Sequence, residues 1–539
     1  MCQLIVLLIG AYCAFAGRNL PVGPDGLAYL DVARAYLQHN WHIAVNGYWG
    51  PLYSWLLALA MGICRPGVDT EFAVVRAVNF LVFSAALYAF SVCWHALADC
   101  CGRTDVNQTS IPEAAPYIWI TLGYLLFIVN FAWFVDLVSP DILVAAIVFA
   151  IAAFLFKLND QLPHGVGAYA WLGALLVVGY YAKAILLYFA VFVLGATAIQ
   201  GFLSGNIRKP LTAILAFAAL VFPFVVVLSQ STGHFTPGDS GRLNYAWFVD
   251  GPETKTWMNS DGAPLPFYPG PVAPGPVRVF RLPSLEGVTY APWYDAARFD
   301  QRAHPAFNKH GQLRQLAINL QSLKEEFLGS GAVLLVPLLL LACYTPKVSL
   351  RNFASTWFCI VPVIAVFGMY LLVHLVTRFV LGFSPVLCGA AFASVRVPSG
   401  LQHLAQRAML VGTLVFAAIT TPGLLHYVVS PRKDSVVRDI AIAEALPHYG
   451  LTPGSLVGSI GDGQVAYWAH LARVSVVAEV WSIDSARFWS APPAAQQAVL
   501  RSMTDAGAKA VIWREDSDQG CPAEWISFPQ HSGCMISMR

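Results

Sequence analysis

Eleven stretches of this sequence are apolar over about the length that a helix needs to cross a lipid bilayer, roughly 20 residues. They lie, with generous ends, at 2–16, 72–97, 114–135, 141–158, 168–182, 184–200, 211–229, 327–343, 354–373, 379–395 and 408–428. Of the 539 residues, 57% are apolar and only 12% are charged, whereas about 25% of the residues of a soluble domain are charged. A soluble chain of this length could not bury so much apolar surface. The sequence therefore predicts an α-helical polytopic membrane protein with about eleven transmembrane helices. It excludes a soluble enzyme, a disordered chain and a fibrous repeat, and a net charge of +2 gives no sign of a nucleic-acid partner.

The basic residues indicate which loops face the cytoplasm. With the N terminus inside, the inner loops carry most of the lysines and arginines, as the positive-inside rule requires: Arg103, Lys157, Arg208, Lys209, Lys347, Arg351, Arg396 and Arg407. The first loop (17–66) and the long hydrophilic segments 230–326 and 431–539 then all lie outside the cytoplasm. Within the first loop, the apolar stretch 51–63 is too short to span a bilayer, and prolines flank it. We expect it to form a helix at the membrane surface.

The large outer loop, 230–326, combines prolines with aromatic residues. Eleven prolines lie between Pro237 and Pro305, and aromatic clusters occur at 244–248 and 291–295. Flexible linkers are poor in tryptophan and tyrosine, because these side chains are unfavourable when left in water. We therefore expect an ordered, irregular loop that packs over the membrane domain, followed by a helix at 310–326.

The C-terminal segment, 431–539, has the pattern of a small α/β domain. Strand-like runs lie at 456–460, 474–480 and 510–513, and helical runs at 435–447 and 493–506. Gly450 and Gly507 have the position of helix ends. Cys521 and Cys534 lie in a polar tail and can form a disulfide if that tail is outside the cytoplasm. The chain thus divides into a transmembrane domain, 1–430, and an extracytoplasmic α/β domain, 431–539.

Four charged residues lie at the outer edges of the apolar runs, where charges are rare and informative. Asp25 begins a helical pattern in the first outer loop, Asp141 opens a span, Lys183 interrupts a long apolar run, and Arg378 lies between two closely spaced spans. Each residue has a structural alternative: a helix N-cap for the acids, snorkelling to the interface for the lysine, and pairing with a helix C-terminus for the arginine. Together, two acids and two cations on one side suit a phosphate leaving group and a hydroxyl acceptor.

The string Asp25-x-x-x-Tyr29-x-x-x-Ala33-Arg34, followed by Pro51-Leu52-Tyr53 at the start of a short apolar helix, resembles the first outer loop of GT-C glycosyltransferases. These include protein O-mannosyltransferases and the lipid A aminoarabinose transferase. The Ser139-Pro140-Asp141 start of a span, the Lys183 hairpin and the late Arg378 also have counterparts there.

The resemblance implies a hexosyl- or pentosyltransferase of the cell envelope that uses a polyprenyl-phosphate-linked sugar donor and a glycan, lipid or protein acceptor. It implies inversion in one displacement, with Asp25 as general base, Asp141 as a positioning group, and Lys183 and Arg378 as phosphate ligands. It also implies an integral protein of the bacterial inner membrane. Tyr29, Arg34, Asp31 and Asp136 are secondary candidates, and Asp31 is the weaker base because it lies about 240° around the helix from Asp25. Gly26 stands where the relatives often carry a second acid, which argues against a metal site. No metal ligands are therefore assigned, and a divalent metal ion stays an open alternative.

Two other classes of protein fit part of the pattern. A polymerase or ligase of lipid-linked polysaccharide would use arginine and histidine residues of the large outer loop, for which the candidates are Arg278, Arg281, His304 and His310. Such an enzyme has no need of Asp25. A transporter would more often show internal repeats and charges at mid-membrane, and the sequence has no such repeat.

Overall fold

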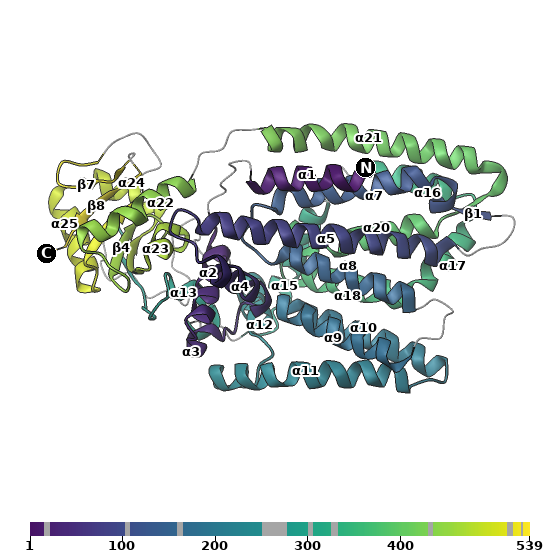
Figure 1. Ribbon diagram of the computed structural model, residues 1–539, viewed down its shortest axis with the longest axis horizontal. Helices are drawn as coiled ribbons and strands as arrows, with labels where there is room; N and C mark the ends of the chain where they lie inside the picture. The colour runs from purple at the N-terminus through teal and green to yellow at the C-terminus, as the bar shows by residue number, and fades with distance from the viewer. Residues whose placement is uncertain are drawn as a thin grey trace.

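A bundle of long apolar helices makes up most of the chain (Figure 1). The computed structural model describes residues 1–15, 22–102, 108–158, 165–250, 277–299, 305–324, 332–429, 435–514, 521–529 and 532–538. Each of the eleven predicted apolar runs corresponds to a helix: α1 (Cys2–Phe15), α5 (Glu71–Gly102), α7 (Pro116–Phe131), α8 (Asp141–Leu158), α9 (Val166–Ala182), α10 (Ile185–Leu203), α11 (Arg208–Thr232), α16 (Ala332–Ala342), α18 (Trp357–Val373), α20 (Phe383–Ser394) and α21 (Gln402–Val429).

Six of the described helices are long and apolar enough to cross a membrane by length and composition: those in α5, α7, α8, α10, α11 and α21. A seventh span results if α16 and α17 (Pro346–Ser355), which are bent by 113° at a short break, count as one. The helices α1, α9, α18 and α20 are apolar but shorter. The polytopic class is therefore supported, and the number of eleven spans stays a prediction.

The core of the bundle lies around α8, of whose apolar window 72% is buried, against 28% for the peripheral α11. On the neighbouring α5, the indole of Trp94 stacks on Trp119 of α7 with ring centroids 4.1 Å apart. Two glycines allow this close packing. A Cβ atom on Gly123 or Gly389 would lie 2.5 or 2.6 Å from the Trp94 ring, which is closer than atoms can approach.

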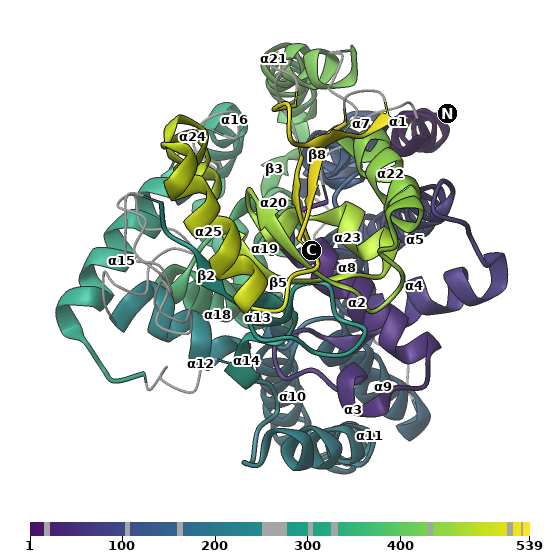
Figure 2. The ribbon, with the colours of Figure 1, turned by 90° about the vertical axis from the view of Figure 1, so that its left-hand side faces the viewer.

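The first loop, the large loop and the C-terminal domain gather at one end of the bundle (Figures 1 and 2). This end carries α2 (Pro24–Leu37), α3 (Trp41–Ala44), α4 (Pro51–Cys64), α12 (Ser240–Tyr245), the π-helical turn η2 (Ala246–Asp250), α13 (Ala291–Tyr294), α14 (Ala296–Phe299) and α15 (Lys309–Leu323). The predicted surface helix 51–63 is α4, which starts at a proline, as helices often do. That all three segments lie at one end agrees with the predicted topology, while the side of the membrane stays a prediction. A small pair of strands, β1 (Gln108–Ser110) and β3 (Arg396–Pro398), lies at the opposite end (Figure 1).

The C-terminal domain is a six-stranded sheet with helices. The strands of this sheet are β2 (Phe280–Arg281), which comes from the large outer loop, and β4 (Leu456–Ile460), β5 (Ser475–Val480), β6 (Ala510–Trp513), β7 (Ile526–Ser527) and β8 (Cys534–Ser537). The order is β2-β5-β4-β6-β8-β7, with β5, β4 and β6 parallel and the others antiparallel to their neighbours. The helices are α22 (Ser435–Ala445), α23 (Tyr467–Ala472), α24 (Ser482–Ser490) and α25 (Pro493–Asp505).

The strands β4, β5 and β6 and the helices α22 and α25 lie where the sequence predicts them. Gly450 and Gly507 have φ angles of 80° and 96°, the left-handed conformation expected after a helix. The edge strand β2 was not predicted. It comes from the large outer loop and pairs with β5, with Phe280 opposite Glu479. The loop and the C-terminal domain are therefore joined by a shared sheet.

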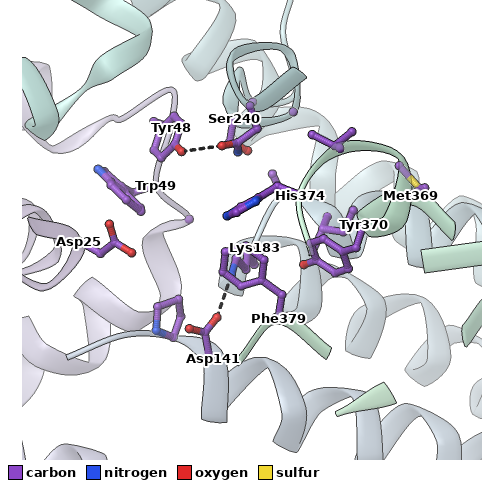
Figure 3. Close-up of a pocket in the computed structure, with 18 of the residues that line it drawn as sticks. Asp25, Tyr48, Trp49, Asp141, Lys183, Ser240, Met369, Tyr370, His374 and Phe379 are labelled. Carbon is purple, nitrogen blue, oxygen red and sulfur yellow. Dashed lines mark hydrogen bonds and ion pairs between the residues drawn. The ribbon is translucent and has the colours of Figure 1, made fainter. Parts of the chain in front are cut away.

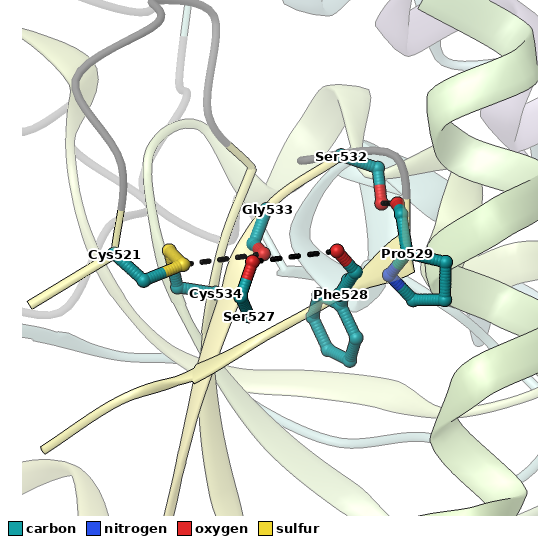
Figure 4. Close-up of a disulfide and its surroundings, with 7 residues drawn as sticks. All are labelled: Cys521, Ser527, Phe528, Pro529, Ser532, Gly533 and Cys534. Carbon is teal, nitrogen blue, oxygen red and sulfur yellow. Dashed lines mark hydrogen bonds between the residues drawn. A yellow bond between two sulfur atoms is a disulfide. The ribbon is translucent and has the colours of Figure 1, made fainter. Parts of the chain in front are cut away.

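A disulfide joins Cys521 to Cys534 at the start of β8 (Figure 4). Beside it, the backbone N–H of Phe528 donates a hydrogen bond to the carbonyl oxygen of Gly533 at 2.9 Å. The bridge and this hydrogen bond connect the segment that carries the edge strand β7 to β8, which also pairs with β6.

Candidate active site

Asp25 lies in the first turn of α2, and its carboxylate does not cap that helix. The N-cap position belongs to Gly23, and no side chain caps the helix there. Instead, Oδ2 of Asp25 lies 2.7 Å from Nη2 of Arg378, and Oδ1 accepts a hydrogen bond from the indole N–H of Trp293 at 3.2 Å. The N-cap alternative for this residue is therefore wrong, and Asp25 contacts residues more than 260 positions away in the chain.

Asp141 begins α8 and is nearly inaccessible, with a side-chain exposure of 2%. Its Oδ1 lies 2.7 Å from Nζ of Lys183, and its Oδ2 lies 3.6 Å from Nη1 of Arg378. The hydroxyl of Ser139 donates a further hydrogen bond to Oδ2 at 2.9 Å. A buried carboxylate requires such partners, and here they include both predicted phosphate ligands.

Lys183 occupies the break between α9 and α10. Its backbone is extended (φ −160°, ψ 134°), which ends one helix and turns the side chain toward Asp141. Burial lowers the pKa of the Lys183 ammonium, and the charge of Asp141 partly opposes this shift. The ammonium lies 3.8 Å from the ring centroid of Phe379, and the guanidinium carbon of Arg378 lies 5.2 Å from the same centroid. Both cations therefore contact the same carboxylate and the same ring.

These four charged residues border one cavity of about 390 Å³ at the end of the bundle. Figure 3 labels Asp25, Asp141 and Lys183 around it. Its volume falls within the range of sites for small ligands. The walls come from α2, the turn before α4, the start of α8, the break before α10, the α12–η2 segment, α13, and the region from the end of α18 to α19 (Thr377–Val380). Three of these elements, α12, η2 and α13, belong to the large outer loop.

Aromatic residues dominate one side of the cavity. Tyr48 and Trp49 come from the turn before α4, Trp247 from η2 and Trp293 from α13. Except for the pair Trp49 and Trp247, the ring centroids are 4.5 to 5.7 Å apart. We call these four rings the aromatic wall.

His374 lies at the end of α18 and also borders the cavity (Figure 3). Its ring stacks on Phe248 with centroids 3.9 Å apart. Burial, together with the nearby charges of Arg378 and Lys183, lowers the pKa of His374 to about 4. The imidazole is therefore neutral at physiological pH and adds no third positive charge.

The secondary candidates have different places. Tyr29 borders the cavity and packs against Trp49, with ring centroids 5.0 Å apart. Asp136 is buried beside α21, where it accepts a hydrogen bond from the Tyr427 hydroxyl at 3.3 Å, and it does not border the cavity. Its candidacy as an active-site acid therefore finds no support in the geometry.

Asp31 and Arg34 face the C-terminal domain instead of the cavity. Asp31 is 1% exposed and lies 2.7 Å from Nδ1 of His470. Arg34 donates a hydrogen bond to the carbonyl oxygen of His470 at 2.7 Å and lies 3.6 Å from Glu71. Both residues connect the first outer loop to the C-terminal domain, in accordance with the different helical face predicted for Asp31.

The residues considered for a polymerase or ligase do not gather at the cavity. Arg278 pairs with Asp484 of α24 at 2.7 Å, Arg281 lies in β2, and His310 lies in α15. None of these three borders the cavity, and His304 lies outside the described residues.

The site offers few ligands for a metal ion. Within the described part of the chain, no group of three or more histidine, cysteine, aspartate or glutamate residues is arranged to hold one. The two carboxylates of the cavity each already contact a cation. The residues present therefore do not fit a resident divalent ion.

Sequence reasoning missed the residues that complete the cavity. Trp293 and Trp247 belong to the two aromatic clusters of the large loop, which indicated order without indicating a site. Tyr48 and Trp49 form part of the same first loop as Asp25. His374 has an extended backbone directly after α18, and Val376 is extended before α19, so no helical spacing in the sequence connects His374 with Arg378.

The overall arrangement is similar to that of several solved structures, although no protein-family model and no curated protein sequence matches the chain. The apo crystal structure of the Archaeoglobus fulgidus oligosaccharyltransferase shares 12% identity over 95% of this chain and 69% of that chain, with a TM-score of 0.49. ArnT from Cupriavidus metallidurans, in the apo state and bound to undecaprenyl phosphate, shares 13% identity over 99% of this chain and 97% of that chain, with TM-scores of 0.41. ArnT, a lipid A aminoarabinose transferase, is the type of enzyme that the sequence resembles. At these identities and TM-scores, the likeness by itself assigns no activity to the chain.

Proposed function

We propose that this protein is a membrane glycosyltransferase that moves a sugar from a polyprenyl-phosphate donor to a hydroxyl group of a glycan, lipid or protein, with inversion at the anomeric carbon. The observation that carries the proposal is the meeting of two cations and two carboxylates in one cavity at the end of the bundle. Lys183 and Arg378 contact the same carboxylate, that of Asp141, at 2.7 and 3.6 Å. An oxyanion bound beside this carboxylate is therefore within reach of both.

The two cations have the properties of phosphate ligands. Arg378 provides a planar fork that matches phosphate oxygens, and Lys183 adds a compact charge. Their role is to stabilise the negative charge that develops on the leaving phosphate as the bond to the sugar breaks. A phosphate is a weak base, so its departure needs no proton.

Asp25 is the general base in this proposal. The acceptor oxygen attacks the anomeric carbon, the bond from that carbon to the phosphate oxygen breaks, and the acceptor proton passes to Asp25. The polyprenyl phosphate leaves with both electrons of the broken bond. When a phosphate binds the fork of Arg378, Asp25 loses part of its contact with that cation and becomes available to the acceptor hydroxyl.

The setting suits a lipid-linked donor. The cavity opens where apolar helices meet the loops, and its lining includes apolar side chains from α10 and α18 beside the two cations: Ile185, Leu187, Met369 and Val373. A charged headgroup can bind Lys183 and Arg378 while its chain stays in the bilayer. The proposal places the protein in the bacterial inner membrane, with the cavity and the C-terminal domain, 431–539, outside the cytoplasm.

The test separates binding from chemistry. The purified protein in lipid nanodiscs is titrated with undecaprenyl phosphate, and transfer is measured from a panel of polyprenyl-phosphate hexoses and pentoses to cell-envelope acceptors. Lys183→Ala should weaken binding of undecaprenyl phosphate by tenfold or more. Asp25→Asn should bind this lipid normally and lose transfer, because the amide keeps the shape of the side chain and cannot accept the proton.

Lys347→Ala is the matched control, since Lys347 is an exposed lysine of α17, away from the cavity. Equal binding by Lys183→Ala and Lys347→Ala would refute the phosphate site. Near-normal transfer by Asp25→Asn would refute the assignment of the base. Retention of the anomeric configuration in the product would exclude a single displacement.

A further inference from the structure

The aromatic wall does more than connect the loops from which its residues come. Its four rings belong to three segments that are separated by about 200 and about 45 positions in the sequence. A cluster that only fastened these segments together would close on itself, as apolar contacts in a core do. Here each of the four rings also borders the cavity.

We propose that the aromatic wall is the subsite for the sugar ring of the donor, with Trp247 and Trp293 as its central contacts. This inference rests on the proposed function and adds the part of the site that recognises the transferred group. The faces of aromatic rings carry partial negative charge. The C–H groups on one face of a sugar ring are weakly positive and apolar, so the two surfaces are complementary.

The position of Asp25 argues for the sugar ring over other ligands. One carboxylate oxygen contacts Arg378 at 2.7 Å, and the other accepts a hydrogen bond from Trp293 at 3.2 Å. Asp25 thus lies between the cations and the aromatic wall. In a sugar phosphate, the anomeric carbon lies between the phosphate and the rest of the ring. With the phosphate on the cations and the ring against the wall, this carbon comes to lie beside Asp25.

Polar groups at the edge of the wall complete the subsite. The Tyr48 hydroxyl donates a hydrogen bond to Oδ1 of Asn244 at 3.3 Å, and Ser240 also borders the cavity (Figure 3). The hydroxyl and amide groups can exchange hydrogen bonds with sugar hydroxyls. An apolar surface with a few polar groups at defined positions is typical of small-ligand sites.

The wall is also held in a fixed shape. The side-chain oxygen of Asn46 accepts hydrogen bonds from the backbone N–H groups of Tyr48 and Trp49, both at 2.9 Å. The amide nitrogen of Asn46 donates to the carbonyl oxygen of Tyr294, the neighbour of Trp293. Since Asn46 is 5% exposed, this scaffold is shielded from water. A preformed surface loses little entropy when a ligand binds to it.

The experiment compares lipid phosphates that differ only in the sugar. The full-length protein in nanodiscs is titrated with bare undecaprenyl phosphate and with the same lipid phosphate carrying a hexose or a pentose. The wild type should bind at least one of the glycosylated lipids more tightly than the bare lipid. Trp247→Ala should weaken binding of that glycosylated lipid about tenfold and change binding of the bare lipid less than twofold, while Trp247→Phe, which keeps a ring, should retain most of the preference.

The control is Trp171→Ala, which removes the same side chain from an exposed position on α9. Should Trp247→Ala lose its cooperative melting transition, Trp247→Leu takes its place in the same comparison. Equal affinities of the wild type for bare and glycosylated lipids, or equal losses for both in the variant, would overturn the sugar subsite. Failure of the proposed function is a separate result, since Lys183→Ala would then leave binding of the bare lipid unchanged.

Discussion

Asp31 joins three separate segments of the outer region, and its replacement by asparagine tests how they depend on one another. The side chain lies on α2, 1% exposed. Its oxygens accept hydrogen bonds from the backbone N–H and the hydroxyl of Thr289 at 2.8 and 2.9 Å, and Nδ1 of His470 lies 2.7 Å away. The first loop, the large loop and the C-terminal domain therefore meet at one carboxylate.

The stability that Asp31→Asn should remove from this contact follows from its three hydrogen bonds. A hydrogen bond to a charged group contributes about 1.5–3 kcal/mol. The asparagine side chain keeps one acceptor oxygen and turns an N–H donor toward a donor of Thr289 or His470, so that about two of the three bonds weaken. We expect the free energy of opening this contact to fall by about 3 kcal/mol. Since about 1.4 kcal/mol is a factor of ten, the equilibrium for opening this contact should rise about a hundredfold.

Hydrogen exchange measured by mass spectrometry on the protein in nanodiscs reports this opening directly. The backbone amides around Thr289 and in β5 should exchange about a hundredfold faster in Asp31→Asn, while those of α8 should not change. Transfer activity should also fall, because Thr289 precedes Trp293 on the same segment and Trp293 holds Asp25. Asp505→Asn, at an exposed position at the end of α25, is the matched control. If the two variants exchange alike around Thr289, Asp31 does not hold the segments together.

Three further predictions concern the outer region. Burial raises the pKa of the Asp295 carboxyl from 3.8 to about 6, so the folded state favours the protonated form and loses stability as the pH rises from about 4 to about 6. Asp295→Asn should therefore stabilise the protein by about 3 kcal/mol at about pH 7.5 and by nothing below about pH 3 in thermal unfolding. A constant difference across this range would contradict the assignment. A Cβ on Gly50 would lie 2.7 Å from two carbonyl oxygens at the end of α9. Gly50→Ala should therefore lower the free energy of unfolding by about 1–3 kcal/mol and reduce transfer. Gly167→Ala, whose Cβ meets nothing within 4 Å, should do neither. Replacing Cys521 and Cys534 by serine should destabilise the C-terminal sheet by about 3 kcal/mol and speed its proteolysis. Peptide mapping that finds both thiols free in the wild type would contradict this prediction.

The helices were predictable because a membrane-spanning helix is a local structure. In a bilayer each helix satisfies its own backbone hydrogen bonds, so an apolar run of the right length is sufficient evidence for it. The break at Lys183 was visible for the same reason, since a charge inside a long apolar run marks the end of a helix or a wet cavity. The strands β4, β5 and β6 followed from short β-branched runs between helical ones.

The contacts between distant segments were not predictable. The strand β2 is only two residues long, Phe280–Arg281, and exists because β5 offers it a free edge. The aromatic wall depends on the meeting of Tyr48, Trp247 and Trp293, which no local pattern brings together. The role of Asp31 likewise depends on Thr289 and His470, which lie 258 and 439 positions away. Such pairings are fixed by the tertiary fold and leave no periodic signal in the sequence.

The charges of the cavity show why single residues predicted the site only in part. The resemblance implied that Asp25 is the general base, Asp141 a positioning group, and Lys183 and Arg378 the phosphate ligands. In the structure the acids and the cations contact one another, because charges removed from water must be paired. Arg378 touches both carboxylates and Lys183 only one. A phosphate that enters therefore competes with Asp141 for both cations and with Asp25 for Arg378 alone. Binding of the donor phosphate and release of the Asp25 carboxylate from its ion pair are coupled through Arg378. A substitution that removes the charge of Arg378 therefore changes donor binding and catalysis together.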